Sequence, residues 1–206
     1  MWIETETQVK FIFLRHGKTK GNEEQRYIGK TDEPLSEAGI QELLMQKKKG
    51  VFPDIQSLYE SPMKRCRMTG EILYPAWSPI LVPEWKEIDF GIWEGKNYEE
   101  LRQDEFYQAW IDSGGKIPFP KGESKELFIR RCVEGFQRIW KEICENKGQQ
   151  PEAIGVIAHG GTIMAILSHY LDGAYFAYQV KNGQGYVCTV SGTKEKFCFA
   201  NVQKIE

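Results

Sequence analysis

The stretch of sequence that decides the fold is residues 9–17, which read VKFIFLRHG. Residues 9–14 are almost wholly apolar and rich in β-branched and aromatic side chains, which is typical of a strand covered on both faces. The apolar run ends abruptly in Arg15, His16 and Gly17. We therefore expect a buried strand that delivers these three residues to its carboxyl end.

A second segment has the same form, because residues 153–158 read AIGVIA and are followed by His159, Gly160 and Gly161. In open α/β sheets, ligands bind outside the carboxyl ends of the strands. A Gly after each His lets the backbone approach a ligand closely, and the first N–H groups of a following helix favour an anion. The repeated placement therefore favours function over packing for these two histidines. The third, His169, lies within the next predicted helix and is expected to be structural or solvated.

The remaining periodicity predicts a layered domain. One predicted helix follows Ser36 with Ile40, Leu43 and Leu44 as its apolar stripe, another opens at Ser61-Pro62, and the longest starts at residues 122–124. Strands are predicted at residues 57–59, 185–190 and 196–202, with Ser191–Thr193 marking a terminal hairpin. This alternation predicts an α/β fold, a three-layer α/β/α sandwich with a mostly parallel central sheet.

The composition shifts between residues 77 and 121, where four Trp, four Pro and four Gly surround one predicted helix that begins near Asn97. We interpret this segment as a small cap over the carboxyl edge of the sheet, since loops on a rigid scaffold commonly carry binding groups. A well-packed surface excursion is the alternative interpretation. Residues 1–206 as a whole are expected to form a single domain.

Charge and cysteine content exclude several classes of protein. The formal net charge is −2 and the pI is about 6.0, so the chain has no global field for nucleic acid or an anionic membrane. The five Cys form no C-x-x-C pair, and no apolar stretch has the length of a signal core or a membrane span. We expect a cytoplasmic protein with reduced thiols that binds neither nucleic acid nor membrane; its oligomeric state is left open.

Any anion site must therefore be local. Arg15 and Arg65 would, if brought together, surround a dianion with planar donors that match phosphate oxygens, and Asn22 could donate one more hydrogen bond. Taken alone, Arg65 is more simply explained by a surface ion pair. No H-E-x-x-H or Cys/His cluster suggests zinc, so no metal or other cofactor is expected.

Four motifs follow one another along the chain, and together they resemble the histidine phosphatase, or phosphoglycerate mutase-like, superfamily. They are Arg15-His16-Gly17-x-Thr19-x-x-Asn22, Ser61-Pro62-x-x-Arg65-x-x-x-Thr69, Glu87-x-x-Phe90-Gly91-x-Trp93-Glu94-Gly95 and His159-Gly160-Gly161. An R-H-G triplet alone is weak, whereas four ordered motifs are specific.

The resemblance implies a role for each of these residues. His16 would be the nucleophile that forms a phosphohistidine, while Arg15, Arg65, Asn22 and His159 would hold the phosphoryl oxygens, with Gly160 also on the substrate. Glu87 matches the family's proton donor, and a raised pKa would suit it to protonate a leaving alkoxide. The alternative for Glu87 is an exposed carboxylate near Trp85.

Two departures from the family pattern bear on substrate choice. Lys18 stands where the family often has Glu and is expected to add positive charge near the mouth of the site. Ile28 stands where the family often has Gln and removes a polar group that could contact the substrate.

The expected activity is that of a metal-independent, histidine acid phosphatase-type phosphomonoesterase acting on a small phosphorylated metabolite. The short interval at residues 88–121 resembles the small phosphatases, α-ribazole phosphatase of cobalamin synthesis among them, more than the mutases, which carry a longer insert. A phosphoglycerate mutase-type phosphoryl transferase remains the first alternative. A binding module that retains the anion pocket without turnover is the second.

Overall fold

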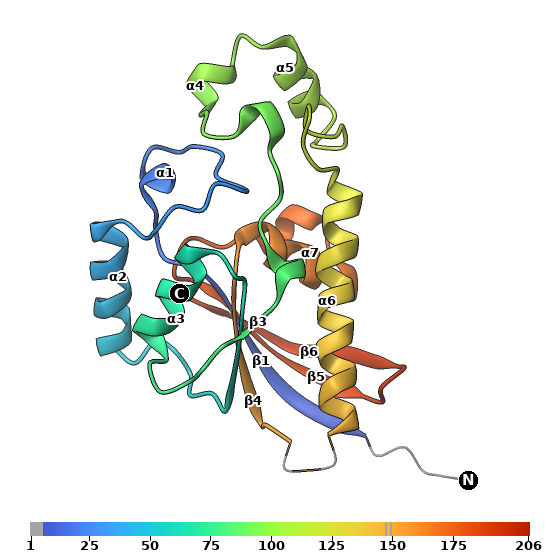
Figure 1. Cartoon of the computed structure of the whole chain (residues 1–206). Helices are drawn as coiled ribbons and strands as arrows, with labels where there is room; N and C mark the ends of the chain where they lie inside the picture. The colour runs from blue at the N-terminus through green and yellow to red at the C-terminus, as the bar shows by residue number, and fades with distance from the viewer. Residues whose placement is uncertain (1–5, 147, 149) are drawn as a thin grey trace.

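The computed structural model describes residues 6–146, 148 and 150–206 and contains a six-stranded sheet (Figure 1). The strands are β1 (Thr7–Arg15), β2 (Ser57–Glu60), β3 (Ile80–Leu81), β4 (Ala153–Ala158), β5 (Gly185–Gly192) and β6 (Phe197–Ile205). Their order is β3-β2-β4-β1-β5-β6; the first four run parallel, and the last two join as an antiparallel hairpin. The expected mostly parallel sheet is confirmed.

The register between β1 and β4 brings the two His-Gly sequences together. These strands are parallel neighbours, and Arg15 lies opposite Ala158. His16 and His159 therefore follow their strands at the same edge of the sheet. The sequence placed each histidine at the end of its own strand, and this register is what brings the two ends together.

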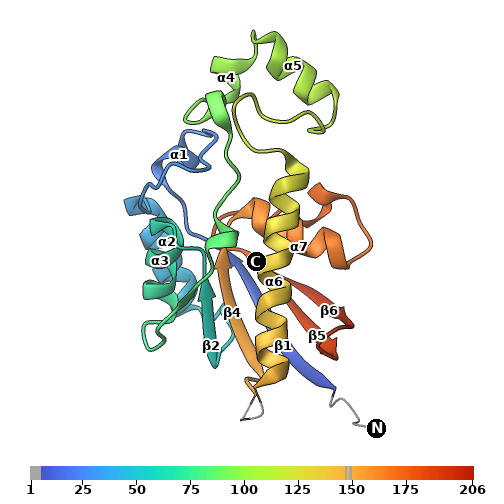
Figure 2. The same ribbon diagram turned by 45° about the vertical axis from the view of Figure 1, so that its right-hand side comes forward.

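Helices cover both faces of the sheet, which gives the three expected layers (Figure 2). On one face, α2 (Glu37–Lys48) and α3 (Lys64–Leu73) pack over Ile12 and Leu14. On the other face, α6 (Lys125–Glu145) and α7 (Gly160–Tyr170) pack over Phe11 and Phe13. Because side chains alternate along a strand, β1 supplies both cores.

Local capping explains two of the predicted helix starts. The Ser36 side chain accepts a hydrogen bond from Gly39 N, and that of Ser124 accepts one from Leu127 N. The apolar residues of α6 that recur at spacings of three and four are all buried, namely Phe128, Cys132, Phe136, Ile139 and Ile143. In α2, however, the inclusion of Leu44 was wrong: Leu44 is 46% exposed, because the helix presents Leu43 to the core and turns the next position to solvent.

Two other boundaries differ from the expectation. Helix α3 begins at Lys64 rather than at Ser61-Pro62, because the N–H of Lys64 bonds to the Asp32 carboxylate of a distant loop at 2.7 Å. The hairpin loop covers residues 193–196 and so begins two positions after the predicted start at Ser191, since Thr193 N donates to Lys196 O at 2.8 Å and closes the loop there.

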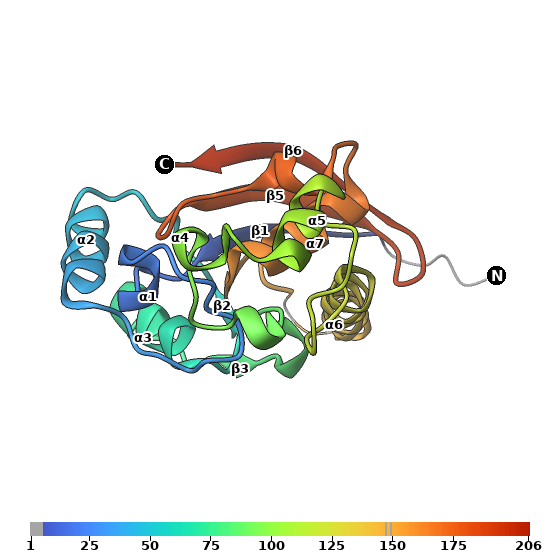
Figure 3. The same ribbon diagram turned by 90° about the horizontal axis from the view of Figure 1, so that it is seen from above.

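The segment at residues 77–121 holds more regular structure than the single predicted helix. Asn97 caps α4 (Tyr98–Leu101) as expected, and α5 (Glu105–Asp112) follows it. Strand β3 and the 3-10 turns η1 (Pro83–Trp85) and η2 (Gly91–Trp93) precede them. Figure 1 shows α4 and α5 above the edge at which the parallel strands end, and in Figure 3, seen from above, they lie in front of the sheet. The cap is held by edge-to-face aromatic contacts of Trp93 with Tyr107, Trp110 and Phe119.

Residues 171–184 connect α7 to the hairpin and include a further 3-10 turn, η3 (Tyr175–Tyr178). Throughout the part of the chain that the structure describes, no helix combines the length and apolar character needed to cross a membrane.

Candidate active site

His16 is a buried, neutral imidazole at the end of β1. Its side chain is 3% exposed, and Nδ1 lies 2.7 Å from the carbonyl oxygen of Gly17. A carbonyl can only accept, so Nδ1 carries the proton and the lone pair of Nε2 is left available. Burial, together with the positive charges of Arg65 and Arg15, lowers the pKa of His16 well below its usual value. The unprotonated imidazole is therefore the stable form at neutral pH.

His159 lies beside His16, with ring centroids 5.1 Å apart, and both of its nitrogens are engaged. Arg65 Nε donates to His159 Nδ1 at 3.2 Å, and Nε2 lies 2.8 Å from Ser61 Oγ. Since the guanidinium can only donate, the proton of His159 is on Nε2 and points to Ser61. Burial, then the Arg65 charge, lowers the pKa of His159 as well.

Arg65 is fully buried and is held by the backbone of a loop from another part of the chain. Its Nη1 donates to Thr31 O and its Nη2 to Gly29 O, both at 2.8 Å. The same loop is fixed from the cap, because Glu94 Oε1 accepts from Gly29 N at 2.8 Å and from Thr31 N at 2.9 Å. The surface ion pair considered for Arg65 is wrong: this side chain belongs to the site.

Arg15 presents an unpaired donor. Nη1 donates to Val180 O at 2.9 Å, whereas Nε is buried without any hydrogen-bond partner. Burial lowers the pKa of this guanidinium, and the nearby Glu87 carboxylate opposes that change. Gly160 packs against the Arg15 guanidinium, where an added Cβ would lie 3.5 Å from Cζ. A buried donor without a partner is costly, so an oxyanion bound here would relieve that cost.

Glu87 is half-buried, and its carboxylate lies at the N-terminus of α7 instead of projecting into solvent. Oε1 accepts from Ile88 N at 2.9 Å, and Oε2 accepts from Gly161 N at 3.3 Å. Burial raises the pKa of this carboxyl, although these backbone donors and the two arginines act in the opposite direction. The raised pKa that the sequence analysis proposed for Glu87 agrees with this environment.

A cavity of about 280 Å³ lies beside this cluster. Arg15, Asn22, Glu87 and Gly160 are among its lining residues, whereas the buried His16, Arg65 and His159 lie behind them and do not line it. Six aromatic side chains from three segments form much of its wall, and two cationic side chains, Arg26 and Lys125, also line it. The aromatic members are Tyr27, Phe90, Trp110, Phe119, Tyr175 and Phe176.

The two departures from the family pattern have different outcomes. Ile28 lines the cavity, as expected of a position that contacts substrate. Lys18 does not reach the mouth, because its Nζ forms an ion pair with Glu42 of α2 at 2.6 Å. The expectation that Lys18 adds charge at the mouth was therefore wrong. His169 is exposed and packs edge-on against Tyr170, as expected of a residue outside the site.

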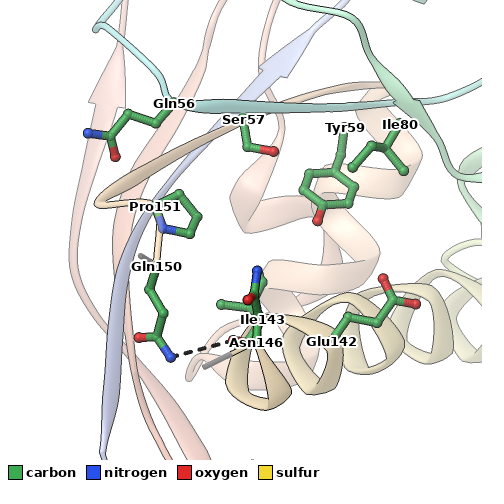
Figure 4. Close-up of a pocket in the computed structure, with 9 residues that line it drawn as sticks. All are labelled: Gln56, Ser57, Tyr59, Ile80, Glu142, Ile143, Asn146, Gln150 and Pro151. Carbon is green, nitrogen blue, oxygen red and sulfur yellow. Dashed lines mark hydrogen bonds between the residues drawn. The ribbon is translucent and has the colours of Figure 1, made fainter. Parts of the chain in front are cut away.

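A larger cavity, of about 570 Å³, lies at the opposite edge of the sheet (Figure 4). Tyr59 points into it from β2, and Glu142 faces it from α6. Glu142 is the only charged residue among the lining residues that the structure describes. Its negative charge makes this cavity unsuitable for a phosphate dianion.

Three residues of the site escaped functional assignment from sequence. Ser61 was noted as a helix opener, although it stands in one of the four motifs. Glu94 stands in the third motif without an assigned role, whereas it anchors the loop that holds Arg65. Asn182 had no sequence signal, because it lies some 160 positions from the residues it contacts.

The geometry defines a class of protein: an α/β domain whose parallel strands end in a cluster of two neutral histidines, two arginines and one carboxyl group. The model of the histidine phosphatase superfamily (branch 1) matches residues 11–202. The chain belongs to that superfamily.

Its relatives include phosphatases and mutases. Phosphoserine phosphatase 1 of Hydrogenobacter thermophilus is 31% identical over 65% of this chain and 67% of its own. The 2,3-bisphosphoglycerate-dependent phosphoglycerate mutase of Corynebacterium diphtheriae is 27% identical over 79% of this chain and 77% of its own. Among solved structures, the alpha-ribazole phosphatase of Shigella flexneri has a TM-score of 0.76 at 19% identity, covering 92% of this chain and 94% of the other, a likeness of fold.

Proposed function

We propose that the chain is a phosphomonoester hydrolase that acts through a phosphohistidine at His16. The observation that carries the proposal is the free Nε2 lone pair of a buried, neutral His16 between two arginines. Nε2 attacks phosphorus, and the bond from phosphorus to the alcohol oxygen breaks. Arg15, Arg65 and the N–H groups at the start of α7 offset the charge on the transferring group. Glu87 delivers its proton to the leaving oxygen.

The second step regenerates the enzyme. Ionised Glu87 accepts a proton from water as the water oxygen attacks phosphorus, the bond to Nε2 breaks, and phosphate leaves. No metal takes part in this scheme. Among residues 6–146, 148 and 150–206, no group of three or more His, Cys, Asp or Glu is arranged to hold one. We therefore expect activity to survive exhaustive dialysis against EDTA.

The proposed substrate is a small phosphorylated metabolite whose alcohol part is largely apolar. The six aromatic side chains of the cavity wall support this, since they bury ring or alkyl surface. Arg26 and Lys125, which also line the cavity, are available to a polar or anionic group elsewhere on the substrate. An α-ribazole phosphate, with its aromatic base, is one candidate of this kind. Phosphoryl transfer between two positions of a phosphoglycerate is the alternative that the mutase relative supports.

The mechanism is tested by trapping the intermediate. A ³²P-labelled aryl phosphate is mixed with the EDTA-treated protein for one turnover, quenched in alkali, and the label is mapped by peptide sequencing. We expect acid-labile label on His16, no label in His16→Ala, and unchanged labelling in His169→Ala, which removes an exposed histidine. Label on Ser or Asp, or full turnover by His16→Ala, would contradict the proposal. Phosphate binding without turnover would indicate a binding module.

Hydrolysis and mutase activity are separated with 3-phosphoglycerate. Because the short cap leaves the phosphoenzyme open to water, phosphate release should exceed isomerisation, and no bisphosphorylated primer should be needed. Isomerisation faster than release would favour the mutase alternative.

A further inference from the structure

The segment at residues 180–184 is bound to the nucleophile strand through its backbone and through one side chain. Arg15 N donates to Gln184 O at 2.9 Å, and Gly183 N donates to Arg15 O at 3.0 Å. Asn182 adds its side chain to this contact. Its Nδ2 donates to His16 O at 3.1 Å, to Gly17 O at 3.3 Å and to Asn22 Oδ1 at 2.9 Å.

The contact with Asn22 settles the orientation of the Asn22 amide. A side-chain amide has one acceptor end and one donor end of nearly equal shape, so an isolated Asn can present either end to a ligand. Here Asn22 Oδ1 accepts from Asn182 Nδ2 and also from Thr19 N at 3.3 Å. Because both donors hold the oxygen, the amide presents its NH₂ end to the cavity that Asn22 lines.

The hydrogen bond from Asn182 to Gly17 O also affects His16. This carbonyl oxygen also accepts the bond from His16 Nδ1 at 2.7 Å, which keeps the Nε2 lone pair free. The Asn182 side chain thus bonds to Gly17 O, which fixes the tautomer of His16. It also bonds to Oδ1 of Asn22, whose amide lines the cavity.

We propose that Asn182 is a positioning residue for phosphoryl binding, acting mainly through Asn22. This inference rests on the proposed function, since it assumes that a phosphoryl group occupies the site. Its consequence is specific: an acceptor at position 182 reverses the Asn22 amide, so that a carbonyl oxygen instead of an N–H faces the phosphate.

Two variants change the contact in different ways. In Asn182→Asp the shape is retained, but a carboxylate faces Asn22 and attracts its NH₂ end, which turns Oδ1 toward the phosphate. In Asn182→Ala the constraint on Asn22 is lost without a reversal. Positioning therefore predicts weaker phosphate binding in Asn182→Asp than in Asn182→Ala. The same carboxylate also faces the carbonyl oxygens of His16 and Gly17, so disruption of the segment alone predicts that order too, and the Asn22→Ala background below is what separates the two explanations.

The readout is binding of inorganic phosphate by titration calorimetry, which does not require turnover. We expect a Kd about threefold to fivefold higher in Asn182→Ala and at least about tenfold higher in Asn182→Asp, in line with the loss or reversal of one hydrogen bond to a charged group. Gln184→Ala is the matched control, because its side chain bonds only within the segment, to Lys181 N. That control should bind phosphate as the wild type does.

A double-mutant cycle with Asn22→Ala completes the test. In that background we expect Asn182→Asp to raise the Kd by less than about twofold, because the amide on which it acts is gone. An undiminished effect would mean that the new charge repels phosphate directly, which would overturn the proposal. Equal effects of Asp and Ala, or wild-type affinity in both, would overturn it too while leaving the proposed function standing. Failure of the wild type to bind phosphate would overturn both.

Discussion

The Nε–H of Arg65 donates a hydrogen bond of 3.2 Å to Nδ1 of His159. This contact leaves His159 with its proton on Nε2, where Ser61 Oγ accepts it at 2.8 Å. A phosphoryl oxygen that used the same proton would have to compete with the Ser61 hydroxyl. The Nε2–H of His159 is thus oriented as a hydrogen-bond donor, but Ser61 Oγ already accepts its hydrogen bond.

Ser61→Ala should therefore separate stability from binding. The buried Nε2–H of His159 loses its acceptor, and we expect the free energy of unfolding to fall by about 1–3 kcal/mol. Phosphate should bind at least as tightly as to the wild type, because the competing acceptor is gone. Urea unfolding and calorimetry measure the two effects, with the exposed Ser78→Ala as control. Phosphate binding weakened tenfold would show that Ser61 itself contacts the anion.

The role of Glu87 is tested through the leaving group. An alkoxide needs a proton as its bond to phosphorus breaks, whereas p-nitrophenolate leaves without one. We expect Glu87→Gln to slow single-turnover phosphohistidine formation by about 10²- to 10⁴-fold for an alkyl phosphate, and far less for p-nitrophenyl phosphate. Single turnover is required because dephosphorylation also uses Glu87. Equal losses for the two substrates would mean that Glu87 shapes the site without donating the proton.

Glu94 should act on binding and not on proton transfer. Its carboxylate holds the backbone of the loop whose carbonyl oxygens bind Arg65. Removal in Glu94→Ala should raise KM by about fivefold or more, with a smaller change in kcat, and the loss should be the same for alkyl and aryl phosphates. Glu99→Ala, at an exposed position in the same cap, is the control. A loss confined to alkyl phosphates would instead identify Glu94 as the acid.

Glu60 makes stability depend on pH. Both carboxylate oxygens are buried without a hydrogen-bond partner, and burial raises the pKa of Glu60 to about 8, against the effect of Arg67. The unfolded carboxyl ionises at its usual pKa of about 4.5, so unfolding releases a proton between these values. The contribution of protonated Glu60 is therefore fully present below about pH 4.5 and lost as pH rises to about 8.

Glu60→Gln removes this titration while keeping the shape. We expect its stabilising effect, relative to the wild type, to be at least about 2 kcal/mol larger at pH 9 than at pH 5. Urea unfolding at both pH values measures it, with the exposed Glu134→Gln as control. A pH-independent difference would show that Glu60 is ionised in the folded protein.

The two central strands and the residues that end them were predictable from sequence alone, whereas their pairing came from the structure. Residues 9–14 and 153–158 are apolar runs that end in His-Gly sequences, and both runs are strands of the parallel part of the sheet. Such strands can be recognised from their own sequence, because burial on both faces requires apolar side chains at consecutive positions. The helix caps at Ser36, Asn97 and Ser124 were predictable for a similar reason, since a cap bonds within three residues.

Tertiary structure alone decided how the chemical groups are set. The tautomer of His159 depends on Arg65, 94 positions away, and the orientation of Asn22 depends on Asn182. Lys18 turned to Glu42 of α2 and away from the mouth of the cavity. In each case several hydrogen-bond partners would have similar energies if only neighbouring residues were considered. The packing of the layers determines which distant side chain lies within hydrogen-bond distance. A local sequence pattern does not encode that distance.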